Sequence, residues 1–170
     1  MVTTASTTVD RTVRLLRNQG MERRYHNEIV GFNSRMSDIH AAIGRVQLRQ
    51  LPEWTEQRQQ NARFLTGNLR GVITPHVDER AEHVYHQYTI RVAATERDAF
   101  VQHLAERGVG TGVYYPVPVH RLPSFGLDLD LPATRQAASE VISLPVHPAL
   151  SLQELETIVI AVNTIAEAGA

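Results

Sequence analysis

The chain has 170 residues and a mass of 19.0 kDa, enough for one ordinary domain, and its 42% hydrophobic content is typical of a globular protein. Seventeen basic and eighteen acidic residues give a formal charge of −1, so the chain lacks the positive surplus that nucleic acids or anionic membranes attract. The absence of cysteine excludes disulfides, thiolate nucleophiles and Cys-ligated zinc.

All seventeen basic residues are arginines, and the sequence contains no lysine. This excludes, within the chain, any chemistry that needs a lysine amine, such as Schiff-base formation with a carbonyl group or with pyridoxal phosphate. The first ten residues lack the basic start and apolar run of a secretory signal, and no later stretch has the length of a membrane span. We therefore expect a cytoplasmic protein.

The first half of the chain predicts helices around one functional loop. Apolar spacing indicates a short helix over 9–17, and residues 21–35 have no period and are expected to form an ordered loop. Residues 37–51 are apolar on two sides, which predicts a helix buried on two faces, and Gly44 within it predicts a close backbone contact. Pro52 suits the first turn of a second helix that ends at Leu69, with a bend near Leu51 and a solvated stretch over 57–60.

The second half alternates strands and helices. Alternating polarity predicts strands over 84–92 and 109–115, with a brief third strand over 142–144. Helices are expected over 96–107, over 133–141, and from a capping box at Ser151 and Glu154 onward. Two prolines make residues 116–120 an extended turn that fixes the direction of His120. The predicted fold class is α+β, with long linking helices and a small C-terminal domain whose few-stranded antiparallel sheet is covered by helices.

Eight histidines raise the question of a metal site. His83 and His86 are three residues apart on a predicted strand and therefore point to opposite faces, and no H-E-x-x-H motif occurs. We expect no metal site, and we expect His86 to lie in the wall of the core with a backbone hydrogen bond. The glycines at 110 and 112 are too closely spaced for a dinucleotide fingerprint, and we expect them to permit close packing.

Two short segments contain residues that are typical of a binding site. Gly31-x-Asn33-x-Arg35 places an amide and a guanidinium directly before a helix, a group that suits an anionic phosphate. The same spacing is equally consistent with residues that only cap and brace that helix. The segment Tyr114–His120 holds aromatic and imidazole groups between prolines, and its alternative interpretation is a surface turn.

Several segments in order resemble the sugar aminotransferases of the DegT/DnrJ/StrS family. They are Leu-Leu-Arg-Asn-Gln-Gly at 15–20, Gly-Phe-Asn-Ser-Arg-Met at 31–36, Ala-Ala-Ile-Gly at 41–44 with Gln47-Leu48, His-Val-Tyr-His-Gln-Tyr at 83–88, Gly-Val-Gly-Thr at 108–111, Tyr-Pro-Val-Pro-Val-His at 115–120 and Ser-Leu-Pro-Val-His-Pro at 143–148. The resemblance covers about residues 1–163. It implies a fold-type I enzyme that depends on pyridoxal phosphate, forms a homodimer, and transfers an amino group from glutamate or glutamine to a keto group on a nucleotide-linked sugar.

The resemblance also assigns roles. It implies that Asn33 reaches the cofactor phosphate of a second subunit, and that Arg35, Tyr115 and His120 line the substrate side. Residues 1–4 are similar to the end of the strand that follows the family's Schiff-base lysine, so we expect that lysine and most of the large domain to lie upstream of this chain. No catalytic residue is therefore assigned here.

This interpretation divides the chain into three parts: 1–36 as a remnant of the large cofactor-binding domain, 37–70 as linking and dimer-interface helices, and 71–170 as the small domain. Two functional hypotheses remain. The chain is the C-terminal part of a split or truncated aminotransferase that acts only with a lysine-bearing partner chain, or it is a non-catalytic fragment or regulatory module that docks on a full-length homologue. An independent small binding domain is disfavoured by the apolar faces of helix 37–51.

Overall fold

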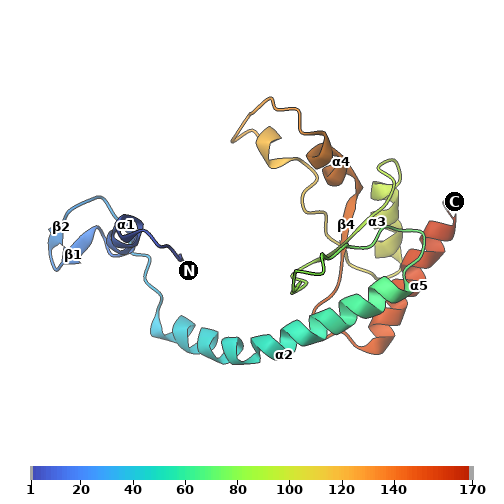
Figure 1. The fold of residues 1–170 in the computed structure, drawn as a ribbon, viewed down its shortest axis with the longest axis horizontal. Coiled ribbons are helices and arrows are strands. Elements are labelled where there is room, and N and C mark those ends of the chain that lie inside the picture. Colours follow the sequence, from blue (N-terminus) through green and yellow to red (C-terminus); the bar gives the residue numbers. More distant parts are fainter. Residues whose placement is uncertain (1, 169–170) are drawn as a thin grey trace. The chain divides into compact units, whose positions relative to one another are not determined.

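A computed structural model describes residues 2–168 and divides the chain into two compact units, Met1–Gln50 and Leu51–Ala170, each of which is described by itself (Figure 1). The elements are α1 (Thr7–Arg17), β1 (Met21–Arg23), β2 (His26–Asn27), α2 (Asp38–Asn68), β3 (Tyr88–Arg91), α3 (Arg97–Glu106), the 3-10 turn η1 (Val119–Arg121), α4 (Pro132–Glu140), β4 (Val141–Leu144) and α5 (Leu152–Ala168). This helix-rich chain with small antiparallel sheets is α+β, as the sequence predicted.

The first unit is built on α1 and a short hairpin. The hydroxyl of Ser6 caps α1 by accepting from the Val9 amide, and Leu15 is the buried side chain of the helix. Residues 21–35 were expected to be an irregular loop, but β1 and β2 pair antiparallel within them. Five strand residues are too few to give a visible period-two pattern, which explains why the hairpin was missed. Val2–Thr4 form no strand, contrary to the resemblance to the end of one, and Met1 lies outside the described residues.

The two helices expected over 37–51 and 53–69 form one continuous helix, α2, with Pro52 inside it. A proline at that position removes one backbone donor, yet the helix continues on both sides. The apolar side chains of its first part are exposed rather than buried: Ile39, Ile43, Val46, Leu48 and Leu51. Apart from its chain neighbours and the backbone of α2 itself, no atom of the described residues lies within 4 Å of the position that a Cβ on Gly44 would take. The contacts that the sequence predicted for this part are therefore not made within residues 2–168.

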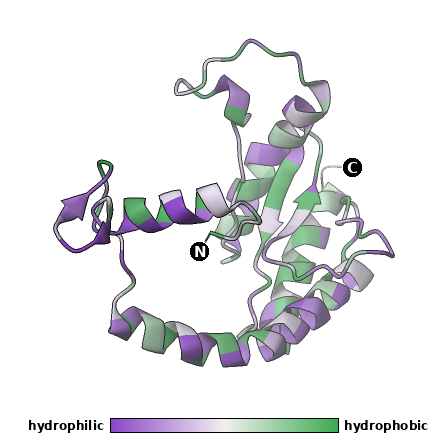
Figure 2. Ribbon diagram, turned by 60° about the vertical axis from the view of Figure 1, so that its left-hand side comes forward, coloured by the Kyte–Doolittle hydropathy of each residue, from purple (hydrophilic) through white to green (hydrophobic). Residues whose placement is uncertain are grey.

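The core of the second unit brings together the end of α2, the sheet, α3 and α5. The buried residues of α2, Ala62 and Leu65, pack in one cluster with Ile90, Leu104 and Val162. In Figure 2 parts of the strands and of the helices of this unit carry hydrophobic colours. Because each of these elements contributes an apolar face to the same cluster, the second unit has the interior of a folded domain.

The sheet of the second unit consists of β3 and β4, paired antiparallel from Tyr88 opposite Leu144 to Arg91 opposite Val141. Its two edges are each extended by a single bridge, one from Ile73 and one from Gly112. The strand predicted over 84–92 is therefore only four residues long, and the strand predicted over 109–115 is reduced to the bridge at Gly112. Alternating polarity predicted more strand than forms: Tyr85 has a positive φ of 46°, and pairing occurs only where a neighbouring strand is present.

The helices near the C-terminus agree with the sequence. The helix predicted over 133–141 is observed as α4. The helix α5 begins after a capping box: the Ser151 amide donates to the Glu154 carboxylate at 2.7 Å, and the Glu154 amide donates to the Ser151 hydroxyl at 3.3 Å. One face of α5 is buried against the core, including Leu155 and Ile158. Within residues 2–168, no helix has the length and apolar character needed to cross a bilayer.

Candidate functional site

The Gly31-x-Asn33-x-Arg35 loop is held against the end of α1 by backbone hydrogen bonds. The Phe32 amide donates to the Leu16 carbonyl at 2.6 Å, and the Ser34 amide donates to the Arg17 carbonyl at 2.9 Å. Asn33 forms an antiparallel bridge with Asn18. These contacts fix the backbone on both sides of Asn33, so its side chain starts from a defined position although it is exposed.

Within this loop, Asn33 and Arg35 are brought into contact with each other. The guanidinium Nε of Arg35 donates to Oδ1 of Asn33 at 3.0 Å. A guanidinium can only donate, so the accepting atom must be the amide oxygen, and the amide nitrogen of Asn33 is the end that remains for another partner. No carboxylate of residues 2–168 pairs with Arg35. The pair therefore presents amide and guanidinium donors with an uncompensated positive charge, which is the chemistry that a phosphate requires.

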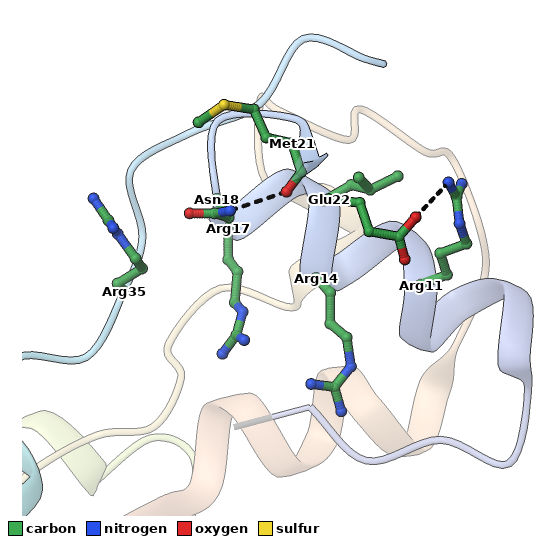
Figure 3. A pocket seen from close by; sticks show the side chains of 8 residues that line it. Arg11, Arg14, Arg17, Asn18, Met21, Glu22 and Arg35 are labelled. Carbon is green, nitrogen blue, oxygen red and sulfur yellow. Dashed lines mark hydrogen bonds and ion pairs between the residues drawn. The ribbon is translucent and has the colours of Figure 1, made fainter. Parts of the chain in front are cut away.

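More arginines line a cavity of about 310 Å³ beside this loop (Figure 3). Arg11 is engaged by Glu22 and Glu28, whose hydrogen bonds raise its pKa above the ordinary value, and Arg14 is engaged by Asp10. In Figure 3 the side chains of Arg14 and Arg17 extend to the same side of α1, whereas Arg35 extends away from them. The arginines of this cavity thus do not converge on one point, and Asn33 is the partner that the structure gives Arg35.

The second unit contains a larger cleft, of about 630 Å³, beside the β3–β4 sheet. It is lined by Arg58, His86, Gln87, Gly110, Thr111, Gly112, Tyr114, Tyr115 and residues 143–147. Gly112 lets the Tyr114 ring lie close to its backbone, because a Cβ at this position would lie 2.5 Å from that ring. This confirms the expectation of close packing at Gly112, whereas a Cβ on Gly110 would meet no atom of the described chain within 4 Å.

Tyr115 and His120 lie in one segment of the second unit. Tyr115 is 67% exposed and lines the cleft, and His120 is half-buried. The expected extended turn is in part a 3-10 turn, η1, which includes His120. The His120 carbonyl accepts from the Leu127 amide at 2.9 Å, a contact that ties the turn to the following loop.

The cleft corrects two sequence interpretations. His86 is exposed and lines the cleft, so its expected place in the core wall is wrong. Residues 57–60 were expected to be solvated, but Arg58 is half-buried and donates to the Tyr85 carbonyl at 3.4 Å, and Gln59 donates to the His83 carbonyl at 3.1 Å. Sequence reasoning missed Arg58, Gln87 and His147 as cleft residues. Gln87 and His147 lie within segments of the family resemblance, which was the only signal for them. Arg58 had no such signal, because a polar helix face is normally solvated.

Among residues 2–168, no group of three or more His, Asp or Glu side chains is placed to hold a metal ion. His83 accepts from the Tyr85 amide at 2.8 Å, and His103 pairs with Glu106 on the exposed face of α3.

Known proteins resemble the chain along nearly its whole length. Residues 1–163 match the model of the DegT/DnrJ/EryC1/StrS aminotransferase family. The chain belongs to this family. Members of the family depend on pyridoxal phosphate.

Among the relatives of this family member, the pleiotropic regulatory protein of Geobacillus stearothermophilus is 37% identical over 86% of the chain and 41% of its own length. The dTDP-3-amino-3,4,6-trideoxy-alpha-D-glucose transaminase of Streptomyces venezuelae is 34% identical over 91% of the chain and 42% of its own length. The crystal structure of S. venezuelae DesV in complex with a ketimine intermediate superimposes with a TM-score of 0.86 at 33% identity, covering 96% of the chain and 46% of DesV. The chain thus spans less than half the length of these relatives.

The residues of the chain fit one end of pyridoxal phosphate and not the other. Asn33 and Arg35 offer donors and positive charge to a phosphate. The sequence has no lysine with which to tether the cofactor covalently. Any covalent attachment must use an amine from outside residues 1–170.

Proposed function

We propose that this family member forms the C-terminal part of a nucleotide-sugar aminotransferase, with the lysine supplied by a partner chain or by residues outside 1–170. The observation that supports the proposal is the Asn33–Arg35 pair, whose amide and guanidinium donors suit a phosphate, in a chain that matches the family over residues 1–163. Several relatives are themselves nucleotide-sugar transaminases by name, including the S. venezuelae protein. When bound, pyridoxal phosphate serves as an electron sink that allows an amino group to move from a donor to a keto sugar.

In this proposal each residue group of the chain has a separate task. Asn33 donates from its amide nitrogen to the cofactor phosphate. Arg35, Tyr115 and His120 line the side on which the nucleotide sugar binds; the exposed hydroxyl of Tyr115 suits a sugar, and the ring of His120 suits a hydroxyl or phosphate group. Proton transfer at the reacting carbon is left to the lysine-bearing segment, because this chain has no residue assigned to it.

The partner surface in this proposal is the first part of α2. Ile39 is 74% exposed, Ile43 and Val46 are more than half exposed, and Gly44 leaves room for a close approach. Exposed apolar side chains at helical spacing are a feature of interfaces. We propose that they pack on a lysine-bearing large domain, since the chain spans less than half of its relatives. Residues 1–36 then complete that domain, residues 37–70 form the interface and residues 71–170 form the small domain.

The test is reconstitution. The purified chain is mixed with a lysine-bearing large-domain chain and pyridoxal phosphate, and the visible absorbance of the cofactor and the transfer of nitrogen to a keto sugar are recorded. We expect both only in the mixture, and we expect Asn33→Ala to raise the cofactor concentration needed. Failure of a stable complex to bind cofactor would overturn the proposal.

A second candidate function follows from the same absence of lysine. The chain would dock through the first part of α2 on a complete homologue and regulate it without contributing to turnover. The exposed face of α2 favours this function as well as the first. Ile43→Asp abolishes assembly in both cases, but only in the first does assembly bring a gain of turnover, so activity of the assembled complex distinguishes them.

A further inference from the structure

The polar side chains that line the cleft beside the β3–β4 sheet are neutral or basic. Arg58, His86, Gln87 and His147 line it, together with the hydroxyl groups of Thr111, Tyr114 and Tyr115. No aspartate or glutamate is among the described residues that line it. Glu154, which lies near enough to His147 to be influenced by it, is already bound by Ser151 and is outside the lining. The polar lining therefore favours an anion over a cation.

Arg58 is the fixed positive charge of this cleft. It is half-buried, and its Nη1 donates a long hydrogen bond, of 3.4 Å, to the Tyr85 carbonyl. No carboxylate of residues 2–168 lies within 4.0 Å of its guanidinium. A guanidinium has five donors in a planar fork, and a partly desolvated one without a counter-ion gains from an oxyanion. The remaining donors of Arg58 are thus available to a ligand.

The same lining also contains apolar and backbone groups. Leu144, Pro145 and Val146 belong to it, and so do Gly110 and Gly112, which have no side chains. A ligand that matches this lining has a short carbon chain and an anionic end at Arg58. A carboxylate matches one guanidinium in charge and in planar geometry, whereas a phosphate dianion carries both of its charges on one group, and no second arginine is present in the lining.

We propose that this cleft binds the carboxylate of the amino donor, with Arg58 as the residue that holds it. The inference rests on the proposed aminotransferase function for the identity of the ligand. Donor and acceptor must react in turn at the same point of the cofactor, so the anchor of the donor lies within reach of the sugar site. Tyr115, proposed for the sugar side, lines the same cleft as Arg58 and is consistent with such sharing.

The test uses the 170-residue chain and glutarate, a dicarboxylate with no amino group. Backbone amide resonances of Gly110, Gly112 and Ser143 are followed during titration with glutarate, with the neutral diamide of glutarate, and with inorganic phosphate. We expect saturable shifts with glutarate, none with the diamide, and weaker binding of phosphate. Shifts of equal size with the diamide, tighter binding of phosphate, or no shift at these amides with glutarate would each overturn the inference.

Variants on α2 separate Arg58 from general charge. Arg58→Gln is expected to weaken glutarate binding at least tenfold, and Arg58→Lys, which keeps the charge but loses the fork, to weaken it less. Arg63→Gln removes the same charge from an exposed position of the same helix outside the cleft lining, and we expect no change. An equal loss in the Arg63 variant would contradict the role of Arg58. If Arg58→Gln does not fold, the comparison of Arg58→Lys with the wild type decides.

This experiment needs neither lysine nor cofactor, so its outcome is independent of reconstitution. Glutarate binding without reconstituted activity would leave the cleft assignment in place and count against the proposed function. Reconstituted activity without glutarate binding would support the proposed function and overturn the assignment of the cleft.

Discussion

Arg35 fixes the orientation of the Asn33 side chain: its Nε donates to the amide oxygen at 3.0 Å, which turns the amide nitrogen of Asn33 outward. The backbone of Asn33 is held independently by its bridge to Asn18. Of the two positions that an asparagine amide can take by rotation of half a turn, only one allows this hydrogen bond. We therefore propose that Arg35 acts on the phosphate side through Asn33, in addition to the substrate role that the resemblance implied.

This relationship predicts the effect of changing Arg35. In titrations with inorganic phosphate followed by the side-chain amide resonances of Asn33, Arg35→Ala is expected to weaken binding about fivefold, on the order of 1 kcal/mol. Arg35→Gln, whose amide can still donate to Oδ1, is expected to restore part of the loss. Combined with Asn33→Ala, the change at Arg35 should have a smaller effect than it has alone. Fully additive losses would show that Arg35 binds the anion on its own.

Asn61 ties α2 to the segment that follows β4. It is 1% exposed, donates from Nδ2 to the His147 carbonyl at 2.9 Å, and accepts from Gln57 at 3.0 Å. Asn61→Ala leaves that carbonyl without its donor and is expected to lower the free energy of unfolding by about 1–3 kcal/mol. Urea denaturation measures this, and Gln60→Ala on the exposed face of the same helix is the control, with a change below about 0.5 kcal/mol.

Gly112 and Gly110 form a matched pair for testing the shape of the cleft. A Cβ on Gly112 would lie 2.5 Å from the Tyr114 ring, whereas one on Gly110 would meet nothing within 4 Å in the described chain. We therefore expect Gly112→Ala to displace the Tyr114 ring, seen as large changes in its aromatic resonances, and Gly110→Ala to leave them unchanged. Equal effects of the two substitutions would contradict the close packing at Gly112.

The capping box at the start of α5 predicts an acid dependence of stability. Hydrogen bonds from the backbone amide of Ser151, and then from its hydroxyl, lower the pKa of Glu154 below its ordinary value. A carboxylate with a lowered pKa in the folded state stabilises that state above the ordinary glutamate pKa, and the contribution is lost as the pH falls through the lowered value.

We therefore expect the difference in unfolding free energy between the wild type and Glu154→Gln to be constant near neutral pH. The difference should shrink as the pH falls below the ordinary glutamate pKa and through the lowered pKa of Glu154. Urea denaturation at a series of pH values measures it. Glu156→Gln on the same helix is the control, and an identical acid profile for the two variants would argue against the capping interaction. Ser151→Ala is expected to cost about 1 kcal/mol at neutral pH.

The sequence alone predicted the elements whose signal is local. Apolar periodicity gave α1, α3, α4 and α5, and the Ser151–Glu154 spacing gave the capping box, because helices are stabilised by contacts between residues three or four positions apart. It also singled out Asn33 and Arg35 as residues that either bind an anion or brace the helix that follows, and the missing lysine is a fact of composition.

The tertiary structure decided what depends on partners distant in the chain. Whether an extended segment becomes a strand depends on a neighbour, so the segment 109–115 is reduced to a bridge to Ser143. The cleft residues Arg58, His86 and His147 come from three separate segments, and no local pattern could join them. The direction of the Asn33 amide was likewise set by a hydrogen bond rather than by residue type. Pairing, cavities and side-chain orientation arise only after distant parts of the chain have packed, which is why composition and periodicity did not contain them.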